Sequence, residues 1–410
     1  MPQAVSSAYG RDRAVNRTVA VSIVAAMIGV MFAGSTLLTP LYVIYQQQLG
    51  FSQIALTLIY AVYVVGNLAA LLVFGRLSDE IGRRRAALPS LAVAAIGALV
   101  FMFGRGTAAL YWARMLSGLG IGVAAGTGTA WLAELVGSKD KTRATAIATS
   151  TNFLGIALGS LVAGALAQYT DLPLVWPFVV YLVAVLAVAA LVWTAAPETM
   201  ASPVRGLRDI SVRPRIGVPR EIRAEFVAPA VTGFGAMALV GFYAALAPSI
   251  LAHNLHVTDH AAAGALVFEL GLAVSIVIWT TQALDSRRAM LGALVLMIPA
   301  VALVVAAQTL ASMAIMIVAT AMCGLTAGLG YRGSLQVVNQ IAPAERRAEV
   351  VSSYFVCGFS GNALPVIGIG VIATFVSPIW ASLVFAGMIV VFAIVAFVFG
   401  LKYTRAPAKG

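Results

Sequence analysis

The chain has 410 residues, of which 61% are hydrophobic and only 10% are charged, with a formal net charge of +11. A soluble domain carries about a quarter charged residues, and soluble cores stop growing near roughly 250–300 residues, so the composition excludes one large soluble domain. The basic excess does not indicate nucleic-acid binding, because the bases lie in short connections between apolar runs. The chain is therefore expected to be a membrane protein with many spans.

The polar amino terminus is followed by twelve segments that are long and apolar enough to cross a bilayer, which takes about 20 mostly apolar residues in a helix. The expected spans are residues 19–45, 53–75, 86–104, 108–135, 143–168, 174–195, 226–252, 260–283, 289–307, 310–338, 348–375 and 379–401. Residues 1–18 lack the short apolar core of a signal peptide, so a cytoplasmic tail is expected there. Residues 402–410 are expected to form the carboxyl-terminal tail.

The placement of the bases predicts the orientation. Of the 26 Lys and Arg residues, 23 lie in the tails and in the connections of one side, and only Arg105 lies in a connection of the other side. Because Lys and Arg concentrate in cytoplasmic loops, both termini are expected in the cytoplasm and the protein in a bacterial-type inner membrane. The six tryptophans, Trp131 among them, lie near the expected span ends, where we expect them to act as interfacial anchors.

Residues 196–225 form the only long connection between spans and contain six arginines and, among their prolines, Pro203, Pro214 and Pro219. They predict a basic cytoplasmic linker between one half, residues 19–195, and another, residues 226–401. An interfacial amphipathic helix around residues 213–226 is the alternative.

The two halves repeat each other at an offset of 206 residues, which places Asp79 on Asp285 and Gly118 on Gly324. After a three-residue deletion, Arg84 and Arg85 also align with Arg287 and Arg288. Two similar halves that face each other predict a central cavity near the middle of the membrane.

The connection between the second and third spans reads Gly75-Arg76-Leu77-Ser78-Asp79-Glu80-Ile81-Gly82-Arg83-Arg84-Arg85. Glycine and charge between two apolar runs predict a tight cytoplasmic hairpin. The pattern resembles the G-x-L-a-D-x-x-G-R-R loop of the major facilitator superfamily, although Glu80 stands where the family usually has a base. The resemblance covers residues 19–401 and implies an all-α membrane fold of twelve helices in two pseudo-symmetric halves. It also implies a secondary transporter rather than an enzyme.

The resemblance further implies a gate on the cytoplasmic side, with Asp79 as a latch against the start of the eleventh span, around residues 345–352. A carboxylate there would meet the positive end of a helix. The expected gate residues are Gly75, Asp79, Gly82, Arg83 and Arg84. The alternative is that the loop only marks topology, with residues 83–85 binding lipid phosphates.

Three charged residues lie inside expected spans, where a charge is costly and usually functional. Arg114 begins a segment similar to the family's R-x-x-x-G-x-G motif, whose arginine is associated with proton coupling or substrate anions. The alternative for Arg114 is that it reaches the outer headgroups. Arg332 is expected either to bind an anionic solute from the inside or to reach the interface.

Glu269 is the only one of the fifteen acids in the middle of a span. A desolvated carboxyl group can take up and release a proton near neutral pH, so Glu269 is expected to couple transport to protons or to bind substrate. The alternative is a neutral or arginine-paired structural acid.

Other polar side chains within the spans are candidates to line the cavity. They are Tyr42, Asn67, Asn152, Tyr243, Gln336, Asn339 and Asn362. A hydrogen bond between helices is the alternative for these polar groups. The fifth span resembles the glycine-rich motif of drug/proton antiporters, but Ser160 replaces its proline. The three histidines lie near one outer connection without a clear set of metal ligands, and no metal site is expected.

No G-x-x-x-x-G-K-[ST] loop is present, so ATP-driven transport by this chain alone is not expected. We expect an ion gradient, most simply of protons, to drive transport without a cofactor. Few fixed charges in the cavity favour a lipophilic or weakly charged organic solute, with export favoured. The alternatives are proton-coupled uptake of a sugar, organic acid or other metabolite and, in a different class, a transporter-like receptor. The expected partners are the solute, protons and membrane lipids, not nucleic acid, and the protein is expected to be monomeric.

Overall fold

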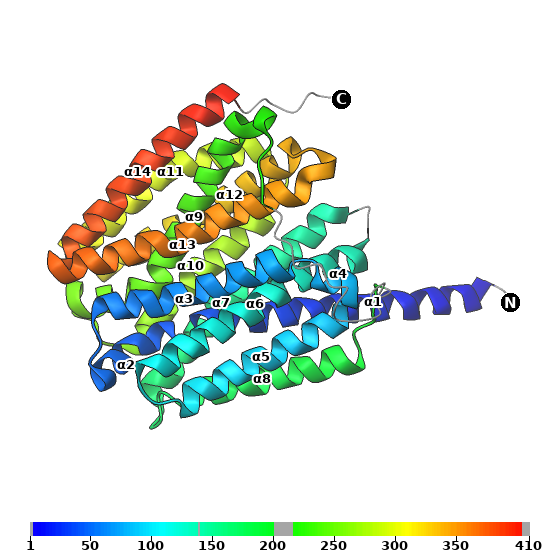
Figure 1. Cartoon of the computed structure of the whole chain (residues 1–410), viewed down its shortest axis with the longest axis horizontal. Coiled ribbons are helices and arrows are strands. Elements are labelled where there is room, and N and C mark those ends of the chain that lie inside the picture. The colour runs from blue at the N-terminus through cyan, green and yellow to red at the C-terminus, as the bar shows by residue number, and fades with distance from the viewer. Residues whose placement is uncertain (1–2, 138–139, 201–215, 404–410) are drawn as a thin grey trace.

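The fold is that of a computed structural model, which describes residues 3–137, 140–200 and 216–403. Across these ranges the chain contains no strand, and twelve helical segments are long and apolar enough to cross a membrane. The predicted all-α membrane fold is thus confirmed. Figure 1 shows two groups of helices, one from each half of the chain, lying side by side.

The first half contains α1 (Gln3–Thr36), η1 (Thr39–Leu41), α2 (Tyr42–Leu49), α3 (Gln53–Phe74), α4 (Leu77–Ile81), α5 (Arg83–Phe103), α6 (Gly106–Val136), α7 (Lys141–Tyr169) and α8 (Trp176–Thr194). The second half contains η4 (Arg220–Ile222), α9 (Arg223–Asn254), α10 (His260–Thr280), α11 (Ser286–Thr309), α12 (Met313–Ile341), η5 (Ala344–Arg346), α13 (Arg347–Phe375) and α14 (Pro378–Tyr403). These bounds agree with the expected spans to within a few residues at nearly every end.

The first expected span departs from a single straight helix. Helix α1 ends at Thr36, and a 3-10 turn with Pro40 separates it from α2. Proline has no amide hydrogen and its ring clashes with the preceding turn, which favours a break here, although Pro229 and Pro248 remain inside α9. Helix α1 also begins at Gln3, so most of the expected tail continues this helix.

The two halves pack their helices in the same way, as their sequence repeat predicts. A Cβ atom on Gly118 of α6 would lie 2.1 Å from the Tyr63 carbonyl oxygen of α3. In the second half, a Cβ atom on Gly324 of α12 would lie 2.8 Å from the Leu270 carbonyl oxygen of α10. Glycine at both positions lets the backbones of neighbouring helices approach closely, which is how membrane helices associate.

Both described ends of the chain lie at one end of the bundle (Figure 1). There Arg17 of α1 donates hydrogen bonds to Leu135 and Val136, and Arg287 of α11 donates one to the Gly400 oxygen of α14 at 3.1 Å. We call this the basic end, because it carries residues 83–85, 143, 287–288 and 346–347. The opposite end is called the far end.

The described part of the segment before α9 does not form the interfacial helix that was the alternative for residues 213–226. Residues 216–219 are not helical, and η4 is a single short turn before α9 begins. Residues 201–215, the rest of the linker, lie outside the described residues.

The interfacial role expected for the tryptophans is wrong for Trp131. The side chain of Trp131 is fully buried, and its indole N–H donates to the Pro197 carbonyl oxygen at 3.1 Å. The segment that follows α8 folds over the end of α6 and covers it, which the span pattern alone did not reveal. The other five tryptophans are between 46% and 68% exposed, as interfacial anchors should be.

Gly118→Val is expected to destabilise the fold strongly. Its added carbon atoms would push α6 away from α3, and overpacking alone typically costs about 1–3 kcal/mol. Gly292→Val is the matched control, because a Cβ atom on Gly292 meets nothing within 4 Å. Thermal melting of the purified variants, monitored by size-exclusion chromatography, should show a large loss for Gly118→Val only. Equal melting of the two variants would argue against this packing.

Candidate functional site

A small central cavity of about 50 Å³ lies between the two halves. Eight of its 17 lining residues are aromatic, four from the first half and four from the second. They are Phe32, Tyr60, Tyr63, Phe153, Tyr331, Tyr354, Phe355 and Phe359. The polar groups between them come from Ser35, Thr36, Asn152 and Asn362. The wall can therefore contact a flat apolar molecule and offer it a few hydrogen bonds.

A larger cavity of about 360 Å³ extends from the centre toward the basic end. It shares Phe32, Asn152, Tyr331, Phe355 and Phe359 with the central cavity, so the two cavities adjoin. Among the described residues, none that lines either cavity is charged.

A third cavity, of about 400 Å³, lies at the far end and shares no lining residue with the central one. Contacts between the halves separate them. Thr39 donates to the Ala244 carbonyl oxygen at 2.7 Å, and Tyr60 donates to Asn362 Oδ1 at 2.8 Å. A Cβ atom on Gly370 would lie 2.4 Å from Thr57 Oγ1. The central cavity therefore adjoins the basic-end cavity and is separated from the far-end cavity.

Arg114 of α6 is completely buried beside the central cavity. Its guanidinium donates to the Ser35 carbonyl oxygen at 2.7 Å and to the Tyr42 hydroxyl, while its Nε–H has no hydrogen-bond partner. The guanidinium carbon also lies 5.5 to 5.9 Å from the ring centres of Tyr42, Tyr60 and Tyr63. These rings stabilise a cation through their π faces. Among the described residues, no carboxylate forms an ion pair with Arg114, so its charge remains uncompensated.

The structure separates the residues that were expected to line the cavity into two groups. Asn67, Asn152 and Asn362 line the central or basic-end cavity, and Gln336 lines a smaller one beside it. Three others do not line these cavities. Tyr42 contacts Arg114, the Tyr243 hydroxyl accepts a hydrogen bond from Thr320 at 3.1 Å, and Asn339 donates to its own helix.

Glu269 lies in the middle of α10 but does not line the described cavities. It shares a helix face with Ala265 and Ile276, four residues before and seven residues after it, and both are exposed. The buried faces of α10 instead pack against α7 and α12. The half-buried carboxylate therefore lies on the side of α10 that points away from the cavity, and no described residue pairs with it.

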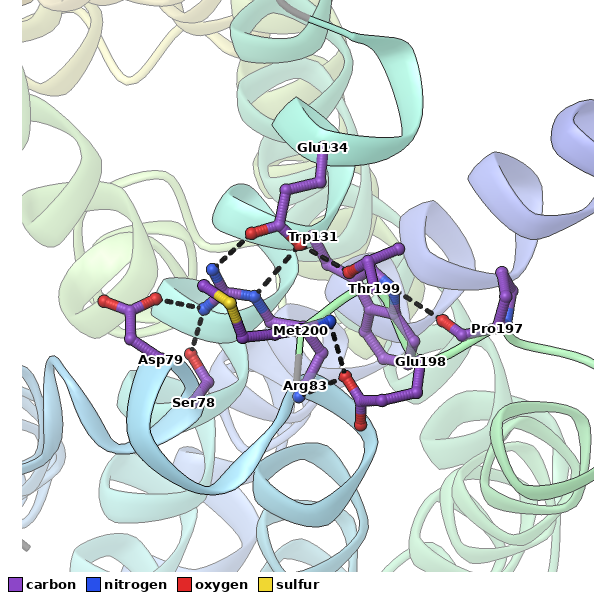
Figure 2. A network of polar contacts seen from close by, with 9 residues as sticks. All are labelled: Ser78, Asp79, Arg83, Trp131, Glu134, Pro197, Glu198, Thr199 and Met200. Atoms are coloured by element: carbon purple, nitrogen blue, oxygen red, sulfur yellow. Dashed lines mark hydrogen bonds and ion pairs between the residues drawn. The ribbon is translucent and has the colours of Figure 1, made fainter. Parts of the chain in front are cut away.

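An ionic network at the basic end centres on Arg83 (Figure 2). The Arg83 guanidinium pairs with Asp79 at 2.5 Å and with Glu134 of α6 at 2.5 Å, and it also donates to Ser78 Oγ at 2.7 Å. Arg83 is only 3% exposed, so lipid phosphates are not its partners in this structure.

Glu198, from the segment after α8, binds the start of α5 in the same network (Figure 2). Its carboxylate accepts from the backbone N–H groups of Arg83 and Arg84, at 2.8 and 2.9 Å. A carboxylate stabilises the positive end of a helix, and here it comes from 115 residues away in the sequence. The hairpin turns at Gly82, whose φ of +100° favours glycine, whereas Gly75 has an ordinary φ of −58°.

The start of α13, where the latch was expected, contacts the linker instead. The backbone N–H of Gly217 donates to Ser353 Oγ at 3.0 Å. Asp79 pairs with Arg83 in its own half, so the latch between the halves stays a prediction for another state of the protein.

The sequence analysis missed the aromatic side chains that dominate the cavity wall. Their spacing contains a signal, because Tyr60 and Tyr63, like Phe355 and Phe359, lie one helical turn apart and share a face. That signal is weak, because the cavity face of a membrane helix cannot be told from its lipid face by apolarity.

Comparison with known proteins places the chain in context. The family model described as Major Facilitator Superfamily matches residues 24–361. Two curated relatives from strains of Mycobacterium tuberculosis, the uncharacterized MFS-type transporters MT1926 and Rv1877, are each 27% identical over 181 residues. That segment is 44% of this chain, and the chain covers only 26% of the length of each relative.

Two solved structures share the fold. A bacterial homolog of the human lysosomal transporter Spinster, in an inward-facing and unoccupied conformation, superposes with a TM-score of 0.69 at 15% identity. The match covers 96% of this chain and 99% of that one. The human organic anion transporter MFSD10 gives a TM-score of 0.66 at 16% identity, with 94% and 99% covered.

Proposed function

This chain belongs to the Major Facilitator Superfamily and is a secondary transporter that works by alternating access, and we propose that it carries a lipophilic, aromatic organic solute that is neutral or anionic. The aromatic wall of the central cavity carries this proposal, together with the buried, uncompensated charge of Arg114 behind it. The positive potential of that charge disfavours a cationic solute and favours an anionic one.

We further propose that the basic end faces the cytoplasm and that solute is exported in exchange for protons. The placement of 23 of the 26 Lys and Arg residues supports this orientation. Export is the useful direction for a lipophilic solute, because such a molecule enters a cell by partitioning through the bilayer without a carrier. If the solute is instead taken up together with protons, the proposed export is wrong and the protein is a symporter.

Glu269 is the proposed proton-coupling residue, although it lies outside the cavity. Helix α10 carries much of the contact between the halves, because Gly264, Gly271 and Ser275 on it pack directly against α7. A charged carboxylate is costly against lipid and a neutral one is much less so. If the two alternating-access states expose the Glu269 side of α10 to lipid to different degrees, protonation of Glu269 changes their relative free energies.

Uptake by proteoliposomes tests the proposed substrate class. The probes share one ring system and differ in charge: 2-naphthoate, 2-naphthamide and 2-naphthylmethylammonium. The carboxylate and the amide should enter faster than in protein-free liposomes, and the ammonium compound at least about tenfold more slowly than the carboxylate. Preferred uptake of the ammonium compound, or of a hydrophilic sugar, would refute the proposal.

Asp79→Asn tests the proposed gate. If Asp79 leaves Arg83 and meets the start of α13 when the basic end closes, loss of its charge should favour the state that is open at the basic end. A charge–dipole contact is worth about 0.3–1 kcal/mol, or up to ~2 when partly buried, and about 1.4 kcal/mol shifts a population tenfold. Spin-label distances across the basic end should lengthen in Asp79→Asn and change less in the mirror variant Asp285→Asn. If wild type and Asp79→Asn populate the state open at the basic end equally, the hairpin does not act as a gate and only determines topology.

A further inference from the structure

Arg332 of α12 is a second buried arginine without a matched anion. The residue is only 7% exposed although it carries a full charge within a span. Its guanidinium donates to two neutral acceptors, the Leu284 carbonyl oxygen at 2.8 Å and Gln336 Oε1 at 3.2 Å. The buried Nε–H has no hydrogen-bond partner. A buried charge that is only partly satisfied is unfavourable, and a bound anion would offset this cost.

Asp285, an acid that acts on Arg332 electrostatically, does not form an ion pair with it. The Asp285 carboxylate instead caps α11 by accepting the Arg288 backbone N–H at 2.9 Å. Among the described residues, Arg332 forms no ion pair.

Arg332 lines a small cavity between the two halves at the basic end. The facing wall comes from α7, where Thr142, Thr145 and Thr149 lie on one side of the helix at spacings of three and four. Gln282 of α10 and Gln336 of α12 complete the polar part of the lining. The cavity has a volume of about 30 Å³, and roughly 10–15 Å³ is enough for one water molecule, so a carboxylate-sized group fits.

This polar cavity adjoins the apolar one. Thr145, Thr149, Tyr331 and Leu335 line both, so an anionic group beside Arg332 would be attached to an apolar body in the 360 Å³ cavity. The first half has no such group, because the residue 206 positions before Arg332 is Gly126, which itself lines the apolar cavity. The charge is therefore a feature of one half and is not imposed by the repeat.

We propose that Arg332, together with Gln336 and the threonine face of α7, forms an anion-binding site at the basic end that holds the acidic group of an aromatic carboxylate or similar organic anion. The apolar part of the same molecule occupies the adjoining aromatic cavity. This site rests on the proposed function and narrows its substrate class from neutral or anionic solutes to organic anions. Because the site takes groups from α7 and α12, a bound anion bridges the two halves.

Binding of 2-naphthoate and 2-naphthamide to the purified full-length protein, measured by isothermal titration calorimetry, tests the site. Wild type should bind the carboxylate at least about tenfold more tightly than the amide, because hydrogen bonds to a charged group are the stronger ones. In Arg332→Gln this ratio should fall at least about tenfold while the affinity for the amide is retained, which also shows that the variant is folded. Arg332→Lys should keep part of the preference. Arg288→Gln removes an exposed base at the same end and should leave the ratio unchanged.

Each other outcome has a distinct meaning. An unchanged ratio in Arg332→Gln, or an equal fall in Arg288→Gln, overturns the site, because general electrostatics would then explain the preference. Equal binding of both probes by wild type also overturns the site and leaves the proposed aromatic cavity intact. Binding of neither probe by wild type overturns the aromatic cavity itself, and the anion site with it.

Discussion

Arg114→Gln is expected to remove most of the discrimination against cationic solutes. The guanidinium lies behind Tyr60 and Tyr63, which line the central cavity, so a solute there is within its field. At about 9 Å and an effective dielectric constant of about 20, a unit charge interacts with it by about 2 kcal/mol, or about 30-fold in binding. The anion is stabilised and the cation is destabilised by this amount, so the ratio of 2-naphthoate to 2-naphthylmethylammonium uptake should fall by about the square of this factor, on the order of several hundredfold.

Arg105→Gln is the control for this change, because it also removes one positive charge but from an exposed position at the far end. Its uptake ratio should match that of wild type. Thermal melting of Arg114→Gln should show a folded protein, because glutamine can still donate to the Ser35 carbonyl oxygen. If the uptake ratio of Arg114→Gln equals that of wild type, Arg114 has only a structural role among its three tyrosines.

Glu269→Gln is expected to abolish accumulation of solute against its gradient while exchange of solute at equilibrium continues. Glutamine is nearly isosteric with a protonated glutamate but cannot release a proton, so conformational change no longer carries one. In proteoliposomes, a step of one pH unit should drive roughly a tenfold concentration of solute in wild type, for one proton per neutral solute, and none in the variant.

Asp171→Asn serves as the control for Glu269→Gln, because Asp171 is an exposed acid in the connection between α7 and α8, away from the proposed gate. It should accumulate solute as wild type does. If Glu269→Gln still concentrates solute after the pH step, another group carries the proton. If both equilibrium exchange and accumulation are lost, Glu269 is needed for the conformational change itself rather than for coupling.

The spans, the two-half repeat and the family could be predicted from the sequence because each depends on a pattern spread over many residues. The hydrophobic length of a span is set by the bilayer, and glycines such as Gly118 and Gly324 mark the same close approach in both halves. The break in the first span was less visible, because proline does not break every span: Pro40 lies at the break, but Pro229 and Pro248 lie inside α9.

The site could be predicted only in part. Arg114 and Arg332 stand out because a charge within a span is rare, and both prove to be buried. Glu269 stands out for the same reason, yet it lies on the side of its helix opposite to the cavity. Because α10 has apolar residues on every face, the sequence does not indicate which side of the helix faces the cavity. The cap that Glu198 places on α5 depends on contacts between distant segments that no local pattern encodes.

Alternating access about the aromatic cavity is the central claim, and paired spin-label distances test it most directly. One pair would replace Arg76 and Ala348 at the basic end, and the other Gln48 and Thr374 at the far end, all four exposed. Cys323 and Cys357 would be changed to serine first. On addition of 2-naphthoate with a change of pH, the basic-end distance should shorten as the far-end distance lengthens. Distances that stay fixed, or that lengthen together, while the same protein transports solute would contradict the account.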